Sequence, residues 1–293
     1  MYKEEYKQYL IQVKKTSENT LAAYMSDLAE FDAFLQKSGV SPLTEARNTE
    51  MVSYLLQMRR DGKSAATINR KIASIRMFYK YLLEQKIISE NPVSGIKSLK
   101  KEKKGIEYLT IEEIDRLLSL PDDSVKGKRD KAILEVLYAT GIRVSELVEV
   151  KLSDVNIRMG FISCMGIHSK ARVIPLGRPA RAALEEYIYD IRKVLVRGNT
   201  EEKALFVNYH GQQLTRQGLW KIIREYAKKA NIENRITPQT LRNSFAVHMV
   251  QNGADLKSLQ ELLGHEDISA MQIYLSETKN RIKDVYDKTH PRA

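Results

Sequence analysis

The chain has one cysteine among its 293 residues, Cys164. It cannot form an internal disulfide or a cysteine-based zinc site, which fits the reducing cytosol. The start, Met1-Tyr-Lys-Glu-Glu-Tyr6, lacks the apolar core that a secretory signal peptide needs. No apolar run approaches the roughly 18 residues that cross a membrane. We therefore expect a soluble, cytoplasmic protein with no membrane partner.

Two further absences narrow the chemistry. The sequence has no internal repeats and no low-complexity tract, which argues against a solenoid or a long disordered region. It also has no clustered carboxylates at metal-ligand spacing. A metal-dependent nuclease or transposase is therefore a poor reading of this chain.

Positive charge is in excess. Lysine and arginine number 48 against 37 acidic residues, a net charge of +11. The apolar share of 43% is ordinary for a globular protein, and the length suffices for two domains. The basic balance favours a polyanionic partner, and nucleic acid is the usual one. A merely basic soluble protein is the alternative.

Residues 1–95 predict a helical N-terminal domain. Apolar residues recur at spacings of three and four in three stretches, opened by Ser17, by Asn48 or Thr49, and by Ser64. Gly39 and Gly62 close the first two stretches. The pair Asn91-Pro92 stops the third, because a residue before proline avoids the helical region.

Residues 96–108 predict a basic linker, since they have little apolar content and no period. They carry five basic and two acidic side chains, a net of +3 that equals the net charge of the whole of residues 1–95. The linker is either a solvated hinge or a hinge that also lies against phosphates. We favour the second reading.

Residues 109–293 predict a second, mixed domain. Thr110 and Glu113 form a capping box, and a helix follows over about 128–140. Period-two segments at 161–164 and 172–175 predict strands joined by a hairpin turn over 166–171. Further helices are expected at 178–195, 216–229, 238–252, 255–263, 268–275 and 279–288.

Four short motifs carry side chains suited to attack on a phosphodiester. They are Ala139-Thr-Gly-Ile-Arg143-Val-Ser-Glu146-Leu147, Thr237-Pro-Gln-Thr-Leu-Arg242, Leu263-Gly-His265 and Gln272-Ile-Tyr274. A phenol can be the nucleophile and form a covalent intermediate. Two guanidiniums can grip the non-bridging oxygens of one phosphate. An imidazole can donate to the charge of the transition state, and nothing in this set requires a metal or cofactor.

In this order and over this length, the motifs resemble the tyrosine recombinase (phage integrase) family, closely its XerC/XerD type. The resemblance also includes Thr20–Phe34 and the ending His290-Pro-Arg-Ala293. It implies a mainly α fold. An N-terminal helical-bundle (SAM-like) domain that binds DNA would precede a mainly helical catalytic domain with a small β-sheet.

The resemblance implies site-specific DNA recombination. Tyr274 would cleave a strand, form a 3′-phosphotyrosyl link and rejoin the strand to another. Arg143 and Arg242 would hold the phosphate, and His265 would assist them. Glu146, three residues after Arg143, would orient its guanidinium.

Two family positions are substituted here. The family's H-x-x-R box reads Gln239-Thr-Leu-Arg242, and its Gly-Lys-Gly hairpin turn reads Gly166-Ile167-His168. Gln239 can hydrogen-bond a phosphate but cannot take a proton, and Ile167 cannot protonate a leaving 5′ oxygen. Lys170 or His168 could substitute for the lost lysine. Neither Asn243 nor His248 replaces the lost histidine, and His248 is expected to be structural.

The partners implied are duplex DNA and further recombinase protomers, in a homo- or hetero-tetramer on DNA. The residues expected to contact DNA are Lys100, Lys101, Lys103, Lys104 and Arg172. The two substitutions leave a second reading open. This chain could be a catalytically inactive recombinase paralogue that binds DNA as a regulatory or architectural protein.

Overall fold

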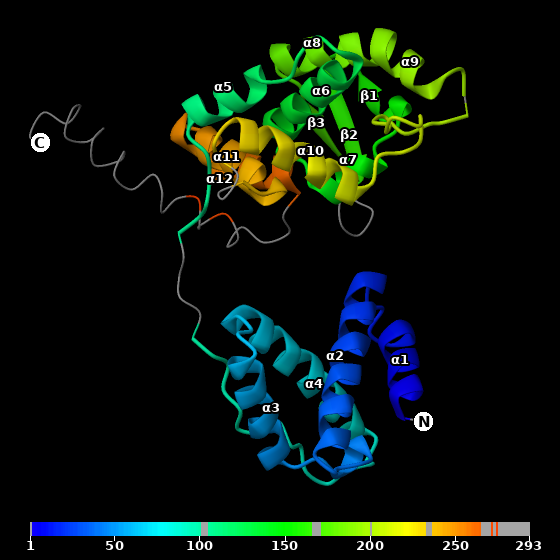
Figure 1. Ribbon diagram of the computed structural model, residues 1–293, viewed down its shortest axis with the longest axis vertical. Coiled ribbons are helices and arrows are strands. Elements are labelled where there is room, and N and C mark those ends of the chain that lie inside the picture. Colours follow the sequence, from blue (N-terminus) through cyan, green and yellow to red (C-terminus); the bar gives the residue numbers. More distant parts are fainter. Residues whose placement is uncertain are drawn as a thin grey trace, which may run out of the picture. The chain divides into compact units, whose positions relative to one another are not determined.

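The computed structural model describes residues 2–100, 105–165, 171–199, 201–232, 236–264, Met271 and Tyr274. The chain divides into two compact units, Met1–Lys104 and Gly105–Ala293 (Figure 1). None of the described helices is both long enough and apolar enough to cross a membrane.

Over its described residues, 2–100, the first unit is a bundle of four α-helices with one short 3-10 turn. Its elements are α1 (Tyr2–Gln12), α2 (Glu18–Lys37), the turn Leu43–Glu45, α3 (Asn48–Arg60) and α4 (Ala65–Glu84). Ser17 caps α2 and Ser64 caps α4, because each side chain accepts a hydrogen bond from a backbone N–H three residues later. Both caps confirm the sequence-based prediction.

Aromatic rings fill the core of this bundle. Phe31 of α2 and Tyr79 of α4 are fully buried, and the Tyr79 hydroxyl donates to the Leu43 carbonyl at 2.8 Å. The helix before residue 17 is not among those predicted from the sequence. In the structure α1 buries Tyr6 and Leu10 against the bundle, four residues apart on one face.

The second unit is mainly helical with a small antiparallel sheet. Its helices are α5 (Ile111–Ser119), α6 (Val125–Thr140), α7 (Val144–Glu149), α8 (Arg178–Glu186), α9 (Arg192–Val196), α10 (Arg216–Lys229), α11 (Pro238–Gln251) and α12 (Leu256–Leu263). A 3-10 turn covers Leu152–Asp154, and a π-helical turn, Tyr187–Ile191, joins α8 to α9. The sequence pattern predicts a single helix over 178–195, and the π turn interrupts it.

The sheet has the order β1 (Val155–Asn156), β2 (Phe161–Met165), β3 (Ala171–Pro175). Ile162 pairs with Ile174 and Cys164 with Arg172 across β2 and β3. Both expected strands are therefore present. Of the turn expected over 166–171, residues 166–170 lie outside the described residues, and Ala171 begins β3. The helices expected over 268–275 and 279–288 also lie outside them, apart from Met271 and Tyr274.

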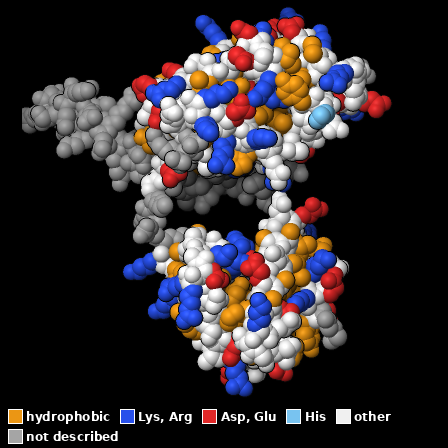
Figure 2. Space-filling model, viewed as in Figure 1, with side chains coloured by type: hydrophobic (Ala, Val, Ile, Leu, Met, Phe, Trp, Pro, Cys, Tyr) orange, Lys and Arg blue, Asp and Glu red, His pale blue; other side chains and the backbone are white. Residues whose placement is uncertain are grey.

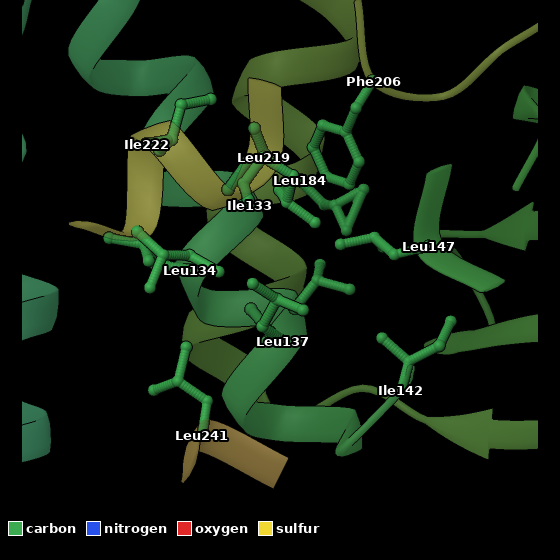
Figure 3. Close-up of a cluster of buried hydrophobic side chains, with 14 of the residues drawn as sticks. Ile133, Leu134, Leu137, Ile142, Leu147, Leu184, Phe206, Leu219, Ile222 and Leu241 are labelled. Atoms are coloured by element: carbon green, nitrogen blue, oxygen red, sulfur yellow. The ribbon is translucent and has the colours of Figure 1, made fainter. Parts of the chain in front are cut away.

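Helix α6 is the centre of this unit. It packs against α8 and α11, while α7 packs against β2 and α10, and α12 packs against β3. Figure 3 shows Ile133, Leu134 and Leu137 of α6 among side chains from the surrounding elements. Leu241 of α11 reaches the same core and is fully buried. Its burial fixes the rotation of α11, and with it the positions of the residues on either side.

Candidate active site

The C-terminal end of α12 gathers three arginines from three other elements. Its last carbonyls have no partner inside the helix, and they carry the partial negative charge of the helix dipole. Arg172 Nε donates to the Leu262 carbonyl at 2.8 Å, and Arg242 Nη2 donates to the Leu263 carbonyl at 2.6 Å. Arg143 Nη2 donates to the Gly264 carbonyl at 3.1 Å. Three consecutive carbonyls therefore bind three guanidiniums.

Gly264 ends α12 in the left-handed conformation, with φ of +62°. A Cβ on this residue would lie 2.9 Å from Nη1 of Arg172. Glycine is thus needed both for the backbone conformation and for the close approach of the guanidinium. His265 follows Gly264 directly, but it lies outside the described residues.

Glu146 is the carboxylate of this site, and it binds two of the arginines. It accepts from Arg143 Nη1 at 2.8 Å and from Arg172 Nη1 and Nη2 at 3.0 and 2.7 Å. It also accepts from the Arg143 backbone N–H at 2.9 Å, which caps α7. Burial alone would raise the pKa of Glu146. The bonds from Arg172 and Arg143, with the charge of Arg172, hold that pKa below its ordinary value.

Arg242 is almost fully buried beneath this cluster. Its Nη1 donates to the Gly141 carbonyl at 2.6 Å, in the turn between α6 and α7. Burial, followed by the like charge of Arg143, lowers the pKa of Arg242 to about 10. The guanidinium therefore stays charged at neutral pH. In the described part of the site, Arg143 and Arg172 pair with the carboxylate of Glu146, and Arg242 lies close enough for its charge to act on Arg143.

Tyr274 lies beside the arginines with its ring buried, 4% exposed. The ring belongs to a small apolar cluster with Phe245, Leu263 and Met271. Burial raises the pKa of the phenol, and the charges of Arg242 and Arg143 offset only part of that rise. The phenol is therefore protonated at neutral pH in this state. Its hydroxyl donates to Asn243 Oδ1 at 3.3 Å.

Some of the remaining expected residues are described by the structure, and the others are not. Gln239 is exposed on α11 and donates to Asn243 Oδ1 at 2.9 Å, and Lys100 is exposed at the end of the described part of the first unit. His248 is buried, and its Nδ1 shares a hydrogen bond with the Tyr138 hydroxyl at 3.0 Å, which suits a structural role. The others lie outside the described residues: Lys101, Lys103, Lys104, Ile167, His168, Lys170 and His265.

The side chain of Arg172 is mostly buried within the site. Its expected role is contact with DNA, but its side chain is only 10% exposed and donates through three nitrogens to Glu146 and α12. The geometry favours a positioning role, and a direct contact with DNA stays a prediction. The alternation along β3 held the missing signal, because it puts Arg172 on the same side as the buried Ile174.

Asn243 is the other residue whose part the sequence reasoning missed. It lies one residue after Arg242 and touches Tyr274, Gln239 and the backbone at Glu107. A spacing of four between Gln239 and Asn243 predicts that they share a helix face. No spacing rule could have placed Tyr274 there, because it arrives from another segment of the chain.

Comparison with known proteins identifies the family. The phage integrase family matches residues 107–281, and the N-terminal SAM-like domain of phage integrases matches residues 4–86. The chain is 45% identical over 278 residues to the tyrosine recombinase XerD of Oceanobacillus iheyensis, covering 94% of each chain. It is 45% identical over 293 residues to the XerD of Listeria innocua, covering 99% of this chain and 98% of the relative.

Solved structures share the fold. A crystal structure of the XerH site-specific recombinase bound to palindromic difH substrate, a post-cleavage complex, superposes with a TM-score of 0.78. The two chains are 21% identical, and the match covers 97% of this chain and 83% of XerH. A lambda integrase dimer bound to a core site superposes with a TM-score of 0.73 at 19% identity, covering 93% of each chain. Together with the sequence matches, these findings establish that the chain belongs to the phage integrase family of tyrosine recombinases.

Proposed function

We propose that this protein cuts and rejoins duplex DNA at a specific site, with Tyr274 as the nucleophile. The observation that carries the proposal is the meeting of Arg143, Arg242 and Tyr274 at the end of α12. A phosphate bound by the two guanidiniums would lie beside the phenol. Glu146 is proposed as a positioning residue because it accepts from Arg143, and Arg172 supports it by donating to the same carboxylate.

The reaction forms a bond between Tyr274 Oη and phosphorus and breaks the bond from phosphorus to the 5′ oxygen. The phenol loses its proton, and the leaving 5′ oxygen gains one. Attack of another strand's 5′ hydroxyl reverses these steps. His265 is proposed to stabilise the transition state, and Lys170 to donate the proton that the family lysine would have given. Losing a general acid or base lowers a rate by about 10²- to 10⁴-fold, so we propose an impaired enzyme.

DNA and further protomers are the proposed partners. The XerH and lambda integrase structures hold DNA, and a lambda integrase tetramer is bound to a Holliday junction. We propose that residues 1–95 and 109–293 both bind the duplex, with the basic linker 96–108 between them. Chromosomal DNA as substrate would place the protein in the cytoplasm.

A nicked suicide substrate tests the proposal. A duplex selected for tight binding carries a nick beside the cleaved phosphate, so that cleavage releases a short fragment and traps the covalent protein. We expect an adduct on a denaturing gel with the parent protein and none with Tyr274→Phe. Absence of the adduct on a verified binding site would favour the second candidate, the DNA-binding paralogue, which the changes at Ile167 and Gln239 motivate.

A further inference from the structure

Asn243 joins three groups through one side-chain amide. Its Nδ2 donates to the Glu107 carbonyl at 3.0 Å. Its Oδ1 accepts from the Tyr274 hydroxyl at 3.3 Å and from Gln239 Nε2 at 2.9 Å. Asn243 thus connects the nucleophile to the segment that begins the second unit.

The chemistry of the partners fixes the orientation of this amide. The Glu107 carbonyl can only accept a hydrogen bond, so Nδ2 must face it and Oδ1 must face Tyr274. An amide oxygen cannot donate. The Tyr274 hydroxyl must therefore be the donor, and it must carry its proton to form the bond. A phenolate in the same place would bring two electron-rich oxygens together.

The surroundings hold both ends of this contact. The Tyr274 ring is buried among Phe245, Leu263 and Met271. Ile106 and Tyr108, on either side of Glu107, pack against the same cluster. The next residue, Leu109, is buried, and its N–H donates to Ser244 Oγ at 2.9 Å. The carbonyl that aims Asn243 is therefore fixed by packing on both sides.

We propose that Asn243 is a positioning residue that holds the protonated hydroxyl of Tyr274 in the DNA-free protein and must release it before attack. The inference rests on the proposed function, because it takes Tyr274 as the nucleophile. The bond exists only in the protonated state, which is the less reactive one. The arginines favour the opposite state, so a phosphate bound between them would compete with Asn243 for the hydroxyl.

The test is a fluorine NMR titration of full-length protein without DNA. The chain has fifteen tyrosines, and a single 3-fluorotyrosine placed at position 274 gives a signal from that residue alone. Asn243→Leu removes the acceptor at similar volume, so the phenol pKa should fall. Asn243→Asp supplies a charged acceptor, so that pKa should rise. We expect opposite shifts of about half a unit or more. Asn156→Leu, whose parent amide accepts from the Met159 N–H, is the matched control and should leave the titration unchanged.

Equal titrations in the parent and both Asn243 variants would overturn the proposal, as would shifts in the same direction. The titration needs no cleavage, so it decides the inference even if the protein never forms an adduct. The suicide substrate tests the release step separately. Asn243→Leu should form adduct several-fold faster than the parent at equal DNA affinity. A slower rate at equal affinity would mean that Asn243 aligns the phenol for attack, and the release step would be wrong.

Discussion

Glu146 holds two of the arginines of the site with one carboxylate. It is 8% exposed and bonds to Arg143 and Arg172, whose side chains are 24% and 10% exposed. Removing one partner of a buried ion pair leaves the other charge without compensation. Without the Glu146 carboxylate, the guanidiniums of Arg143 and Arg172 would both lose their ion-pair partner. Arg242 adds a third positive charge to the same site.

We therefore predict that Glu146→Gln lowers the free energy of unfolding by about 3 kcal/mol at pH 7. The matched control is Glu186→Gln, which breaks the ion pair of Glu186 with Lys128, with side chains 45% and 29% exposed. Its effect should stay below about 1 kcal/mol, because a surface pair contributes little. Urea denaturation of the three proteins measures both values, and equal losses would contradict the central position of Glu146.

The lowered pKa of Glu146 also predicts how stability depends on pH. The folded-state pKa of Glu146 lies below the ordinary 4.5. Its contribution is therefore complete above pH 4.5 and is lost as pH falls through the folded pKa. The parent should lose stability over this acidic window more steeply than Glu146→Gln, when urea midpoints are compared between pH 6 and pH 3. If stability falls equally with pH in the parent and in Glu146→Gln, the pKa of Glu146 is not lowered in the folded protein.

Two substituted positions give a separate prediction about rate. Ile167→Lys restores a proton donor for the leaving oxygen, and Gln239→His restores an imidazole beside the phosphate. Each reversion should raise the rate of adduct formation, by up to about 10²-fold, with DNA affinity nearly unchanged, because both groups act in the transition state. Single-turnover assays at saturating protein measure the rate.

Lys170→Ala separates two explanations of any activity in the parent. If Lys170 has replaced the family lysine, this change abolishes cleavage and Ile167→Lys adds little. If neither reversion produces an adduct on a verified site, the loss of two proton carriers is not the reason for inactivity. The DNA-binding reading would then replace the enzymatic one.

At the level of the single residue, sequence spacing predicts contacts between near neighbours in the chain. The pair Arg143 and Glu146 are three apart, and the structure joins them at 2.8 Å. Spacing does not predict contacts between residues that lie far apart in the chain. Arg172 reaches Glu146 across 26 positions, and Tyr274 reaches Asn243 across 31. Only the packing of β3, α11 and α12 brings these together, and no periodicity encodes it.

At the level of the element, the turn between α6 and α7 is the critical joint. Gly141 ends α6 in the left-handed conformation with φ of +57°, and its carbonyl accepts from Arg242 at 2.6 Å. A Cβ there would lie 2.5 Å from Phe245 Cδ1 and 2.9 Å from Leu263 Cδ2. The turn thus contacts two helices at once. One is α11, which carries Arg242, and the other is α12, whose last carbonyls accept from the arginines.

We predict that Gly141→Ala destabilises the protein by about 2–4 kcal/mol, from backbone strain and overpacking together. The control is Gly253→Ala, which has a positive φ of +94° but no atom within 4 Å of the new Cβ. It should show the backbone effect alone, about 1–2 kcal/mol. Thermal unfolding of both variants measures the difference. If the two losses agree, the contact with α11 and α12 contributes nothing.

Element boundaries could be predicted where capping chemistry marks them. Thr110 and Glu113 form the expected capping box at α5, with bonds of 2.9 and 3.2 Å. The π turn within 178–195 was missed, because an extra residue in one helical turn leaves the apolar pattern almost unchanged. The two-residue strand β1 was also missed. It is too short for any period and exists because β2 offers it a partner.

At the level of the whole molecule, the basic excess does not identify its own binding surface. On the face shown in Figure 2, lysine and arginine side chains are scattered over both units among acidic ones. The charge of +11 alone is thus compatible with many orientations on a polyanion. The linker is the place where basic residues are densest, with four lysines at positions 100, 101, 103 and 104.

The ends of this linker are held, which shapes the last prediction. Leu99 exchanges hydrogen bonds with Asn69 at 2.8 and 2.9 Å in the first unit, and Tyr108 packs in the second. The four lysines fall between these two residues in the sequence. If the linker runs along phosphates, reversing Lys100, Lys101, Lys103 and Lys104 to Glu should weaken DNA binding strongly. It should also reduce the slope of log affinity against log salt, because fewer counterions are released.

The control is a second quadruple charge reversal, at exposed residues of the second unit: Lys193, Arg197, Lys203 and Lys228. Like the linker variant, it changes the net charge from +11 to +3. Each lost phosphate contact should flatten the slope by about 0.9, so four contacts would be visible in a titration from 50 to 200 mM salt. Equal effects of the two quadruple variants would mean that only net charge matters. The linker would then act as a hinge, and the phosphate contacts would have to come from the two units themselves.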